Sequence, residues 1–143
     1  MAFCVTNINV IDVLDDSPAA SCLTALSNNI SIVRGSSFTM IFDLQYQTTA
    51  NDGTITTEPS DLSGYSLNMY IRESSSSTTD LLFCSTQNRM INIDYDTARI
   101  TVEIPVKHTN RLSVGNKYYF IRLISSEGNT QKIIQGIASV SNT

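Results

Sequence analysis

The amino-acid sequence predicts an all-β fold in which short antiparallel strands form a sandwich. Apolar and polar residues alternate through most segments, turn-forming residues separate the segments, and helical spacing is nearly absent. Residues 65–73, which read Y-S-L-N-M-Y-I-R-E, show the alternation most clearly. Side chains of a strand point alternately to its two faces, so this segment is expected to bury one face and expose the other. The expected buried face consists of Tyr65, Leu67, Met69 and Ile71, and the exposed face of Ser66, Asn68, Tyr70 and Arg72.

Composition and charge limit the classes of function. A chain of 143 residues, 41% of them hydrophobic, is long enough for one domain with a hydrophobic core. The formal net charge is −4, the isoelectric point is near 4.7, and the nine Lys and Arg residues are scattered. Nucleic acids and anionic membranes attract proteins that carry a basic patch. We therefore expect neither a nucleic acid nor a membrane as partner.

The cysteines and the N-terminus indicate where the protein is made. Cys4, Cys22 and Cys84 are odd in number, lie far apart and form no C-x-x-C motif. This pattern is typical of buried thiols in a reducing cytoplasm rather than of a disulfide framework. No segment approaches the roughly 20 apolar residues of a membrane span, and the first residues lack a signal peptide's basic and apolar regions. We expect synthesis in the cytoplasm, and any route out of that cell would not be secretion.

The N-terminal segment, residues 2–14, is rich in β-forming residues but its alternation slips. Phe3 and Val5 share one parity, whereas Ile8 and Val10 share the other. A β-bulge in an edge strand would produce this phase change, and so would an arm that pairs with another chain. Both interpretations stay open, and the four residues are candidates for contacts with a partner.

The next residues carry the chain's only helical spacing and its longest polar segment. Residues 18–29 are compatible with one or two helical turns, capped by Ser17, or with a loop. Strands are predicted at Ile30–Arg34 and Ser36–Tyr46. Gln47–Ser60 reads as a long polar loop, with Asn51-Asp52-Gly53 as the tip of a small hairpin. Long loops on β-scaffolds often contact partners.

The second half of the chain continues the pattern of strands and turns. Pro105 ends one strand because it cannot donate a ladder hydrogen bond. The connector after it contains Leu112, an expected inward plug, and Gly136 indicates a bulge or a close backbone approach. The predicted strands are Leu81–Ser85, Met90–Asp94, Ala98–Ile104, Lys117–Ser125 and Lys132–Val140, and the last two form a hairpin. Their expected inward residues are Ala98, Ile100, Val102, Ile104, Tyr119, Ile121, Leu123, Ile134, Ala138 and Val140.

The strand count favours one architecture. Eight or nine short strands at this spacing predict an antiparallel β-sandwich of immunoglobulin-like type. The Cys…Trp…Cys signature of antibody domains is absent because the chain contains no Trp. A small closed barrel is the alternative architecture.

Residue types that carry chemistry are few. His108, the single histidine, has no nucleophile motif beside it and is interpreted as a solvent-exposed loop residue. Asp61, Asp94, Asp96 and Glu103 would suit a calcium site or an acid pair, but turn aspartates commonly bind nearby backbone amides. We predict turn chemistry, no catalytic residue, no metal and no cofactor.

Tyr70 and Tyr118 are the two expected outward tyrosines. Exposed aromatic rings suit stacking on a sugar, which would make the chain a carbohydrate-binding module. Two tyrosines on a sheet face are more often cross-strand pairs or contacts with a partner. We retain both residues as candidates for an interaction.

A series of short motifs occurs in order along the last three-quarters of the chain. The most specific is Asp61-Leu62-Ser63-Gly64-Tyr65 followed by Met69-Tyr70-Ile71-Arg72. The others are Arg34-Gly35-Ser36-Ser37-Phe38, Ile100-Thr101-Val102-Glu103-Ile104-Pro105, Thr109 with Leu112, Gly115 with Tyr118-Tyr119, and Ile133-Ile134-Gln135-Gly136-Ile137. In these motifs the chain from Arg34 to Thr143 resembles a recurrent phage virion module. It is similar to the N-terminal immunoglobulin-like domain of siphophage baseplate upper proteins and related tail-associated proteins.

This resemblance implies a structural, non-enzymatic role in a virion. In that family further domains usually supply specificity, and since the chain ends at Thr143 we expect an adaptor, ring or decoration subunit. Residues 34–143 would form the sandwich, and residues 1–33 an N-terminal arm or edge strand with a connector. Expected partners are copies of the same chain and other virion structural proteins, and no small-molecule ligand is expected.

Three functions follow as expectations. The first is an assembly subunit of the tail, baseplate or neck that acts through sheet edges and loops. The second is a capsid decoration protein, and the third is the carbohydrate-binding module for host attachment. All three place the protein in the virion after synthesis in the host cytoplasm.

Overall fold

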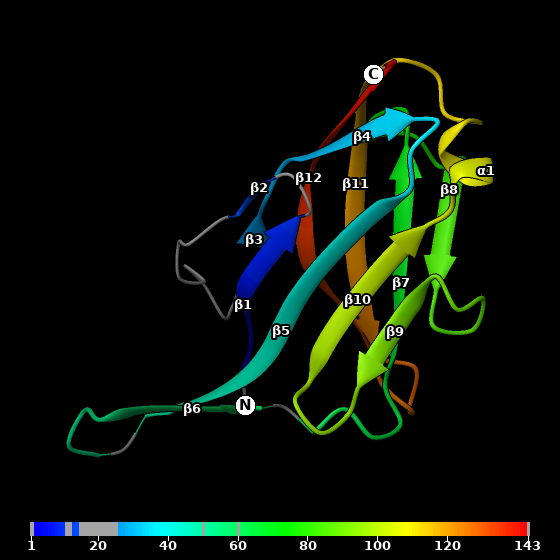
Figure 1. Cartoon of the computed structure of the whole chain (residues 1–143). Helices are drawn as coiled ribbons and strands as arrows, with labels where there is room; N and C mark the ends of the chain where they lie inside the picture. Colours follow the sequence, from blue (N-terminus) through cyan, green and yellow to red (C-terminus); the bar gives the residue numbers. More distant parts are fainter. Residues whose placement is uncertain (1, 11–12, 15–25, 50, 60, 143) are drawn as a thin grey trace.

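A computed structural model describes residues 2–10, 13–14, 26–49, 51–59 and 61–142, and within them the strands form two facing sheets (Figure 1). The first sheet has the order β2 (Val13–Leu14), β1 (Ala2–Val10), β5 (Phe38–Thr49), β10 (Arg99–Ile104) and β9 (Ile91–Asp94), with β6 (Ile55–Pro59) also on β5. The second has the order β3 (Leu26–Ser27), β12 (Thr130–Asn142), β11 (Gly115–Ile124), β7 (Ser66–Arg72) and β8 (Asp80–Ser85), with β4 (Ile30–Arg34) also on β12. The mostly β, sandwich-like fold that the sequence predicts is therefore confirmed.

The core lies between the sheets and is built by the predicted alternation. Leu67, Met69 and Ile71 of β7 are fully buried, and the residues between them are half-buried. Tyr65, also predicted on the buried face, is only half-buried, whereas the remaining predicted inward residues, including Tyr119, Ile121 and Leu123 of β11, are buried. Leu112 follows the single helical turn α1 (Val106–Thr109) and fills the core as the expected plug. Cys84 is buried among these side chains, and its burial raises the thiol pKa to about 12.

β4 belongs to the sandwich rather than to a preceding segment. It pairs in parallel with β12, from Ile30 opposite Ala138 to Arg34 opposite Asn142. Ile30 and Ile32 are buried in the core. The predicted boundary between residues 33 and 34 falls inside this strand. Of the segment 18–29, residues 26–27 form the strand β3 and not a helix, whereas 18–25 lie outside the described residues.

β1 lies within the first sheet, antiparallel to β5. Phe3 is opposite Tyr46, Val5 opposite Leu44 and Val10 opposite Met40. The pairing shifts between Thr6 and Asn9, and Ile8 lies inside this shift. The break in the alternation of the sequence thus coincides with a β-bulge or irregularity of the ladder. One extra residue in a strand moves the side chains of all following residues to the opposite face. In the described structure β1 pairs with strands of its own chain.

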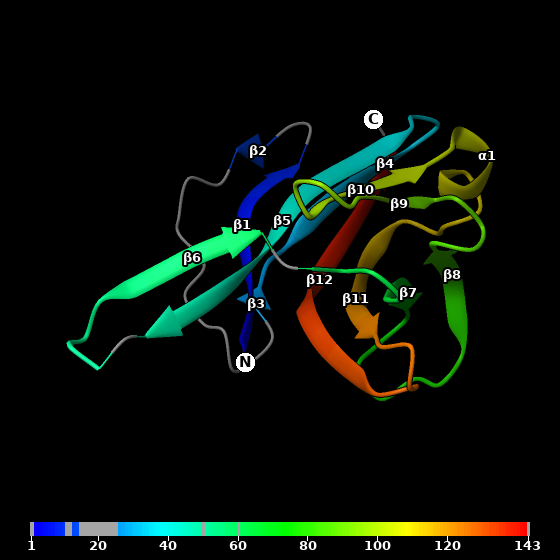
Figure 2. The ribbon, with the colours of Figure 1, turned by 90° about the horizontal axis from the view of Figure 1, so that it is seen from below.

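The predicted polar loop 47–60 is shorter than expected because its flanks are strands. β5 continues to Thr49, and β6 returns beside it, with Gln47 opposite Thr57 and Thr49 opposite Ile55. At the tip, Oδ1 of Asp52 accepts a 2.9 Å hydrogen bond from the N–H of Thr54, and Gly53 has φ of +87°. The predicted hairpin tip is therefore confirmed. β6 and the end of β5 project from the sandwich as a two-stranded ribbon (Figures 1 and 2).

The additional strands β2, β3 and β6 raise the number from the expected eight or nine to twelve in the described residues. Two of them contain only two residues, too few for alternation to be seen in a sequence. Within the described residues, no helix is long and apolar enough to cross a membrane.

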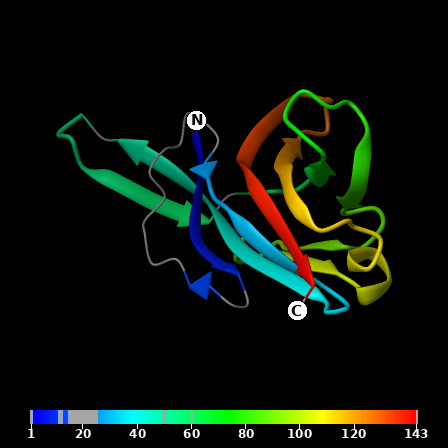
Figure 3. The same cartoon turned by 90° about the horizontal axis from the view of Figure 1, so that it is seen from above.

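Gly136 marks the close backbone approach that the sequence suggests. Residues 28–29, between β3 and β4, lie directly against β12 at this glycine. The N–H of Asn28 donates to the carbonyl of Gln135 over 2.9 Å, and the N–H of Ile137 donates to Oδ1 of Asn29 over 3.0 Å. The buried Tyr119 hydroxyl donates to the carbonyl of Asn28. These bonds join the β3–β4 segment to the second sheet beside β12. Figure 3 shows the ribbon from above.

Two buried charged side chains are satisfied by partners at the surface. Lys117 points inward from β11, and its Nζ lies 2.8 Å from Oε1 of Glu73 and 2.9 Å from Oγ of Ser113. Asp43 on β5 forms two hydrogen bonds with Arg99 on β10, of 2.8 and 3.2 Å. Buried charges require such pairing, since an unpaired one is strongly destabilising.

Candidate functional site: an aromatic and cationic sheet face

The outer face of the second sheet gathers aromatic and basic side chains on four adjacent strands. The ladder registers of β8, β7, β11 and β12 align these residues in rows across the sheet. The central row is Phe83, Tyr70, Phe120 and Gln135, one row beside it is Asp80, Arg72, Tyr118 and Ile137, and the other is Ser85, Asn68, Arg122 and Lys132. We call this surface the aromatic–cationic face.

Phe120 is the centre of a stack of aromatic rings on this face. Its ring centroid lies 4.8 Å from that of Tyr70, with the two planes 20° apart, and 5.7 Å from that of Tyr118. Tyr70 in turn contacts Phe83 at 5.2 Å. Phe120 points away from the core, yet only 2% of it is exposed, because neighbouring side chains cover it. Such packed aromatic pairs contribute about 0.5–1.5 kcal/mol beyond the area they bury.

Three cationic side chains cover the stack. The guanidinium carbons of Arg72 and Arg122 lie 5.0 and 4.9 Å from the Phe120 centroid, and Nζ of Lys132 lies 4.8 Å from it. Arg72 also forms a 2.7 Å ion pair with Asp80. The aliphatic stems of such residues shield apolar surface while their charged groups stay in water. A chain of net charge −4 thus presents three cations and one carboxylate on this face.

The predicted Tyr70 and Tyr118 are brought together here, both half-buried. The Tyr118 hydroxyl accepts a 3.0 Å hydrogen bond from Nζ of Lys132 and donates one of 3.2 Å to Oε1 of Gln135. Nδ2 of Asn68 donates to the Tyr70 hydroxyl over 3.2 Å. Tyr70 stacks on Phe120, and two guanidinium groups also lie over its ring, so ring surface that would stack on a sugar is already in contact.

Exposed apolar side chains border the stack. Leu81 and Phe83 on the edge strand β8 are each 40% exposed, and Ile137 on β12 is 44% exposed. Apolar patches framed by polar groups commonly mark contacts with other molecules. Sequence reasoning missed Phe83, Phe120, Arg122 and Lys132. Their positions beside Tyr70 and Tyr118 follow from ladder registers that the sequence does not show.

The other predicted functional residues adopt structural roles. Oδ1 of Asp94 accepts a 3.0 Å bond from the N–H of Asp96, and Oδ1 of Asp61 a 3.1 Å bond from that of Ser63, which confirms turn chemistry for these two carboxylates. Glu103 lies in the strand β10 and not in a turn. Hydrogen bonds from the backbone and the side chain of Ser63 lower the pKa of the Asp61 carboxyl group. The prediction of a solvent-exposed loop residue is wrong for His108, which lies half-buried in α1. Partial burial and then the positive charges of Lys107 and Arg111 lower its pKa. Among the residues placed by the structure, no three His, Cys, Asp or Glu side chains form a metal cluster.

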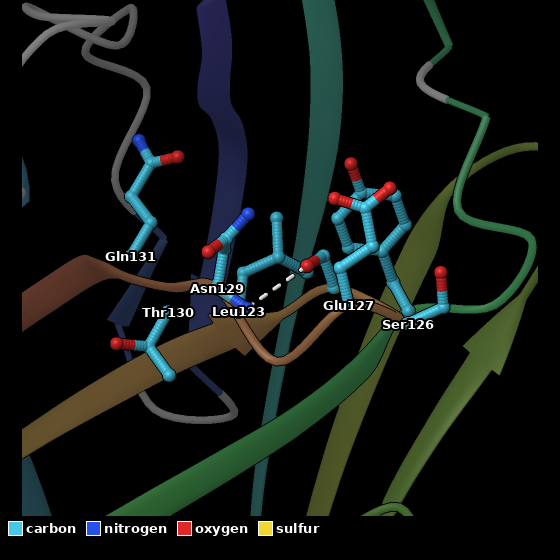
Figure 4. Close-up of a pocket in the computed structure, with 8 residues that line it drawn as sticks. Leu123, Ser126, Glu127, Asn129, Thr130 and Gln131 are labelled. Atoms are coloured by element: carbon cyan, nitrogen blue, oxygen red, sulfur yellow. Dashed lines mark hydrogen bonds between the residues drawn. The ribbon is translucent and has the colours of Figure 1, made fainter.

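A polar pocket lies beside the β11–β12 turn (Figure 4). Its volume is about 290 Å³, and Tyr65 and Leu123 form its apolar part. The N–H of Asn129 donates to Oγ of Ser125 over 3.1 Å and shapes the turn. The remaining lining residues are Ser126, Glu127, Thr130 and Gln131, all exposed to solvent. Glu127 is the one carboxylate among the lining residues, so the pocket offers hydrogen bonding rather than an acid–base pair.

The described contacts of the aromatic–cationic face are of the kind that recognise a ligand or partner. Stacked rings supply apolar area, the cations attract carboxylate or other anionic groups, and the border residues can pack against a second surface. The chain matches no protein-family model, and no curated protein matches it.

Proposed function

We propose that the chain is a non-enzymatic structural protein of a phage virion, an adaptor or assembly subunit of the tail, baseplate or neck. It acts through contacts made by its sheet edges and loops with copies of itself and with other virion proteins. The location is proposed from the sequence resemblance, and the mode of action from the shape of the fold.

We also propose that the fold is of immunoglobulin-like type. In such domains one sheet contains strands B, E and D, and the other contains G, F, C and C′. The orders β5-β10-β9 and β12-β11-β7-β8 match these when the strands are lettered in chain order. β6 then falls between strands B and C as an addition to the common plan.

The observation that carries the proposal is the β5–β6 ribbon. Within the described strands β6 pairs with β5 alone, so its outer edge presents unpaired backbone N–H and C=O groups. Exposed edges of this kind readily accept a strand from another chain, and proteins that must stay monomeric protect them. A ribbon projecting from the body (Figure 2) suits an assembly subunit that reaches its neighbour by adding a strand.

Shortening the ribbon tests this function. Replacing residues 48–56 by Asn-Gly should leave Gln47 opposite Thr57 and close them with a tight hairpin turn. We expect the full-length protein to form oligomers by light scattering, and the shortened protein to lose mass while keeping its unfolding temperature. The core lies outside the ribbon, so its packing should be unaffected.

Asp52→Ser is the matched control, because serine can also accept the hydrogen bond from Thr54 and both strands of the ribbon remain. It should assemble as the wild type does. A wild type that is monomeric throughout, or a shortened protein that assembles unchanged, would contradict the proposed function.

A further inference from the structure

The aromatic–cationic face carries positive charge that the described residues only partly pair. Arg72 is paired with Asp80, but within the described residues no carboxylate lies at ion-pair distance from Arg122 or Lys132. Leu81, Phe83 and Ile137 add exposed apolar surface around these cations. Four strands spaced about 4.8 Å apart give the face a width of roughly 20 Å. A complementary partner would combine carboxylates with an apolar group.

The turn between β9 and β10 has this chemistry. Tyr95 is 56% exposed and stands between the exposed Asp94 and Asp96. The hydrogen bond from the N–H of Asp96 to Asp94 holds the turn in shape. Arg99 pairs with Asp94 in the ladder, but its guanidinium binds both carboxylate oxygens of Asp43. We call residues 94–96 the acidic turn.

We infer that the aromatic–cationic face binds the acidic turn of a second copy of this chain. Arg122 and Lys132 would meet the carboxylates of Asp94 and Asp96, and Tyr95 would pack against the exposed apolar border. The inference rests on the proposed assembly function and adds a second pair of contacting surfaces to the ribbon edge.

The arrangement of the fold makes this contact intermolecular. The acidic turn belongs to the first sheet, whereas the face lies on the outer side of the second sheet, across the core (Figures 1 and 2). One chain therefore cannot bring its own turn onto its own face. A contact between two different surfaces is heterologous, and it produces a ring if the rotation closes or an open array if it does not.

A second positive surface serves as the internal comparison. Lys107 and Arg111 are exposed near α1, together with Val106 and Val114. The acidic turn comes before the start of β10 and α1 comes after its end. The acidic turn and α1 therefore lie at opposite ends of that strand (Figure 1). This surface has similar charge, but the ring contacts of the described residues lie on the aromatic–cationic face, which is why we assign the acidic turn to that face.

Sedimentation velocity of three variants tests the inference. The face variant is Arg122→Glu with Lys132→Glu, and the turn variant is Tyr95→Ser with Asp96→Asn, which keeps Asp94 for the turn. The control, Lys107→Glu with Arg111→Glu, changes the net charge as much as the face variant does. We expect the face and turn variants each to associate about tenfold more weakly than the wild type, because they lose close charge pairs. The control should match the wild type.

Mixing separates a heterologous contact from a general effect of charge. The face variant retains an intact turn and the turn variant an intact face, so their equimolar mixture should associate about tenfold more tightly than either alone. Thermal unfolding checks that each variant is folded, and Arg122→Gln with Lys132→Gln replaces the face variant if it is not. A mixture that associates no more tightly than either variant alone overturns the inference.

Other outcomes show whether the inference alone or also the proposed function fails. A control that weakens association as much as the face variant indicates a general effect of net charge and overturns the inference, while the proposed function stands. If the face variant assembles as the wild type does, the inference is likewise overturned and the proposed function stands. A wild type that stays monomeric up to about 1 mM contradicts both. If that monomer binds an anionic glycan on an array, and the face variant does not, the face recognises sugar rather than protein.

Discussion

Gly136→Ala is expected to lower the free energy of unfolding by about 3 kcal/mol or more. A Cβ at this position would lie 2.0 Å from the carbonyl oxygen of Asn28 and 2.7 Å from its carbonyl carbon. Both atoms belong to the backbone, so no side chain can rotate away. Overpacking of this kind costs about 1–3 kcal/mol, and occasionally more. Displacing the segment would also strain its hydrogen bonds to Gln135, Ile137 and Tyr119, each worth about 1 kcal/mol.

Chemical denaturation measures this effect. Ser141→Ala is the control on the same strand, since Ser141 is exposed and its loss should change stability by less than about 0.5 kcal/mol. If Gly136→Ala is as stable as this control, residues 28–29 do not approach β12 as described.

Phe120→Ala is expected to destabilise the protein by about 3 kcal/mol although Phe120 lies on an outer face. Truncating a buried Phe typically costs 3–5 kcal/mol. Phe120 is 2% exposed, and its removal takes away the ring that Tyr70, Tyr118 and three cations contact. Water can enter the space from outside, which places the loss at the lower end of this range.

Phe83→Ala provides the matched comparison, because Phe83 lies on the same row but is 40% exposed. We expect it to cost about 1 kcal/mol. Denaturant midpoints of the two variants give the comparison directly. Equal losses would mean that the cations do not shield Phe120 from solvent.

The sandwich and most of its core are readable from the sequence because alternation reports burial one strand at a time. Leu67, Met69 and Ile71 fall on one parity and are buried, and Leu112 is recognisable as an apolar residue in a polar connector. The turn role of Asp94 is likewise local, since its hydrogen bond reaches only two residues along the chain. Such features need no knowledge of which strands are neighbours.

What the sequence does not show depends on pairing between distant segments. β4 joins the sandwich through a parallel ladder with β12 at the other end of the chain, so a boundary placed after residue 33 cuts through it. The β6 strand consists largely of Thr, Glu and Pro, and it is a strand because β5 lies beside it. Polar composition made it resemble a loop.

The sequence predicts only part of the candidate site, because the site also depends on pairing between distant strands. The alternation within each strand predicts that Tyr70 and Tyr118 point outward, and this prediction needs only the local sequence. Phe120, also outward by parity, is buried only because Tyr70, Arg72, Arg122 and Lys132 close over it from three strands. Register between strands therefore decides whether separate aromatic residues form one face.

Hydrogen–deuterium exchange at low and high protein concentration tests the central claim, that the chain assembles through its exposed strand edge, most directly. Backbone amides at the free edge of β6 should exchange fast in dilute protein, where water reaches them. In concentrated protein we expect these amides to slow by about tenfold, because a neighbouring strand then accepts their hydrogen bonds. Equal exchange of β6 at both concentrations, in a sample that light scattering shows to be oligomeric, would contradict the account.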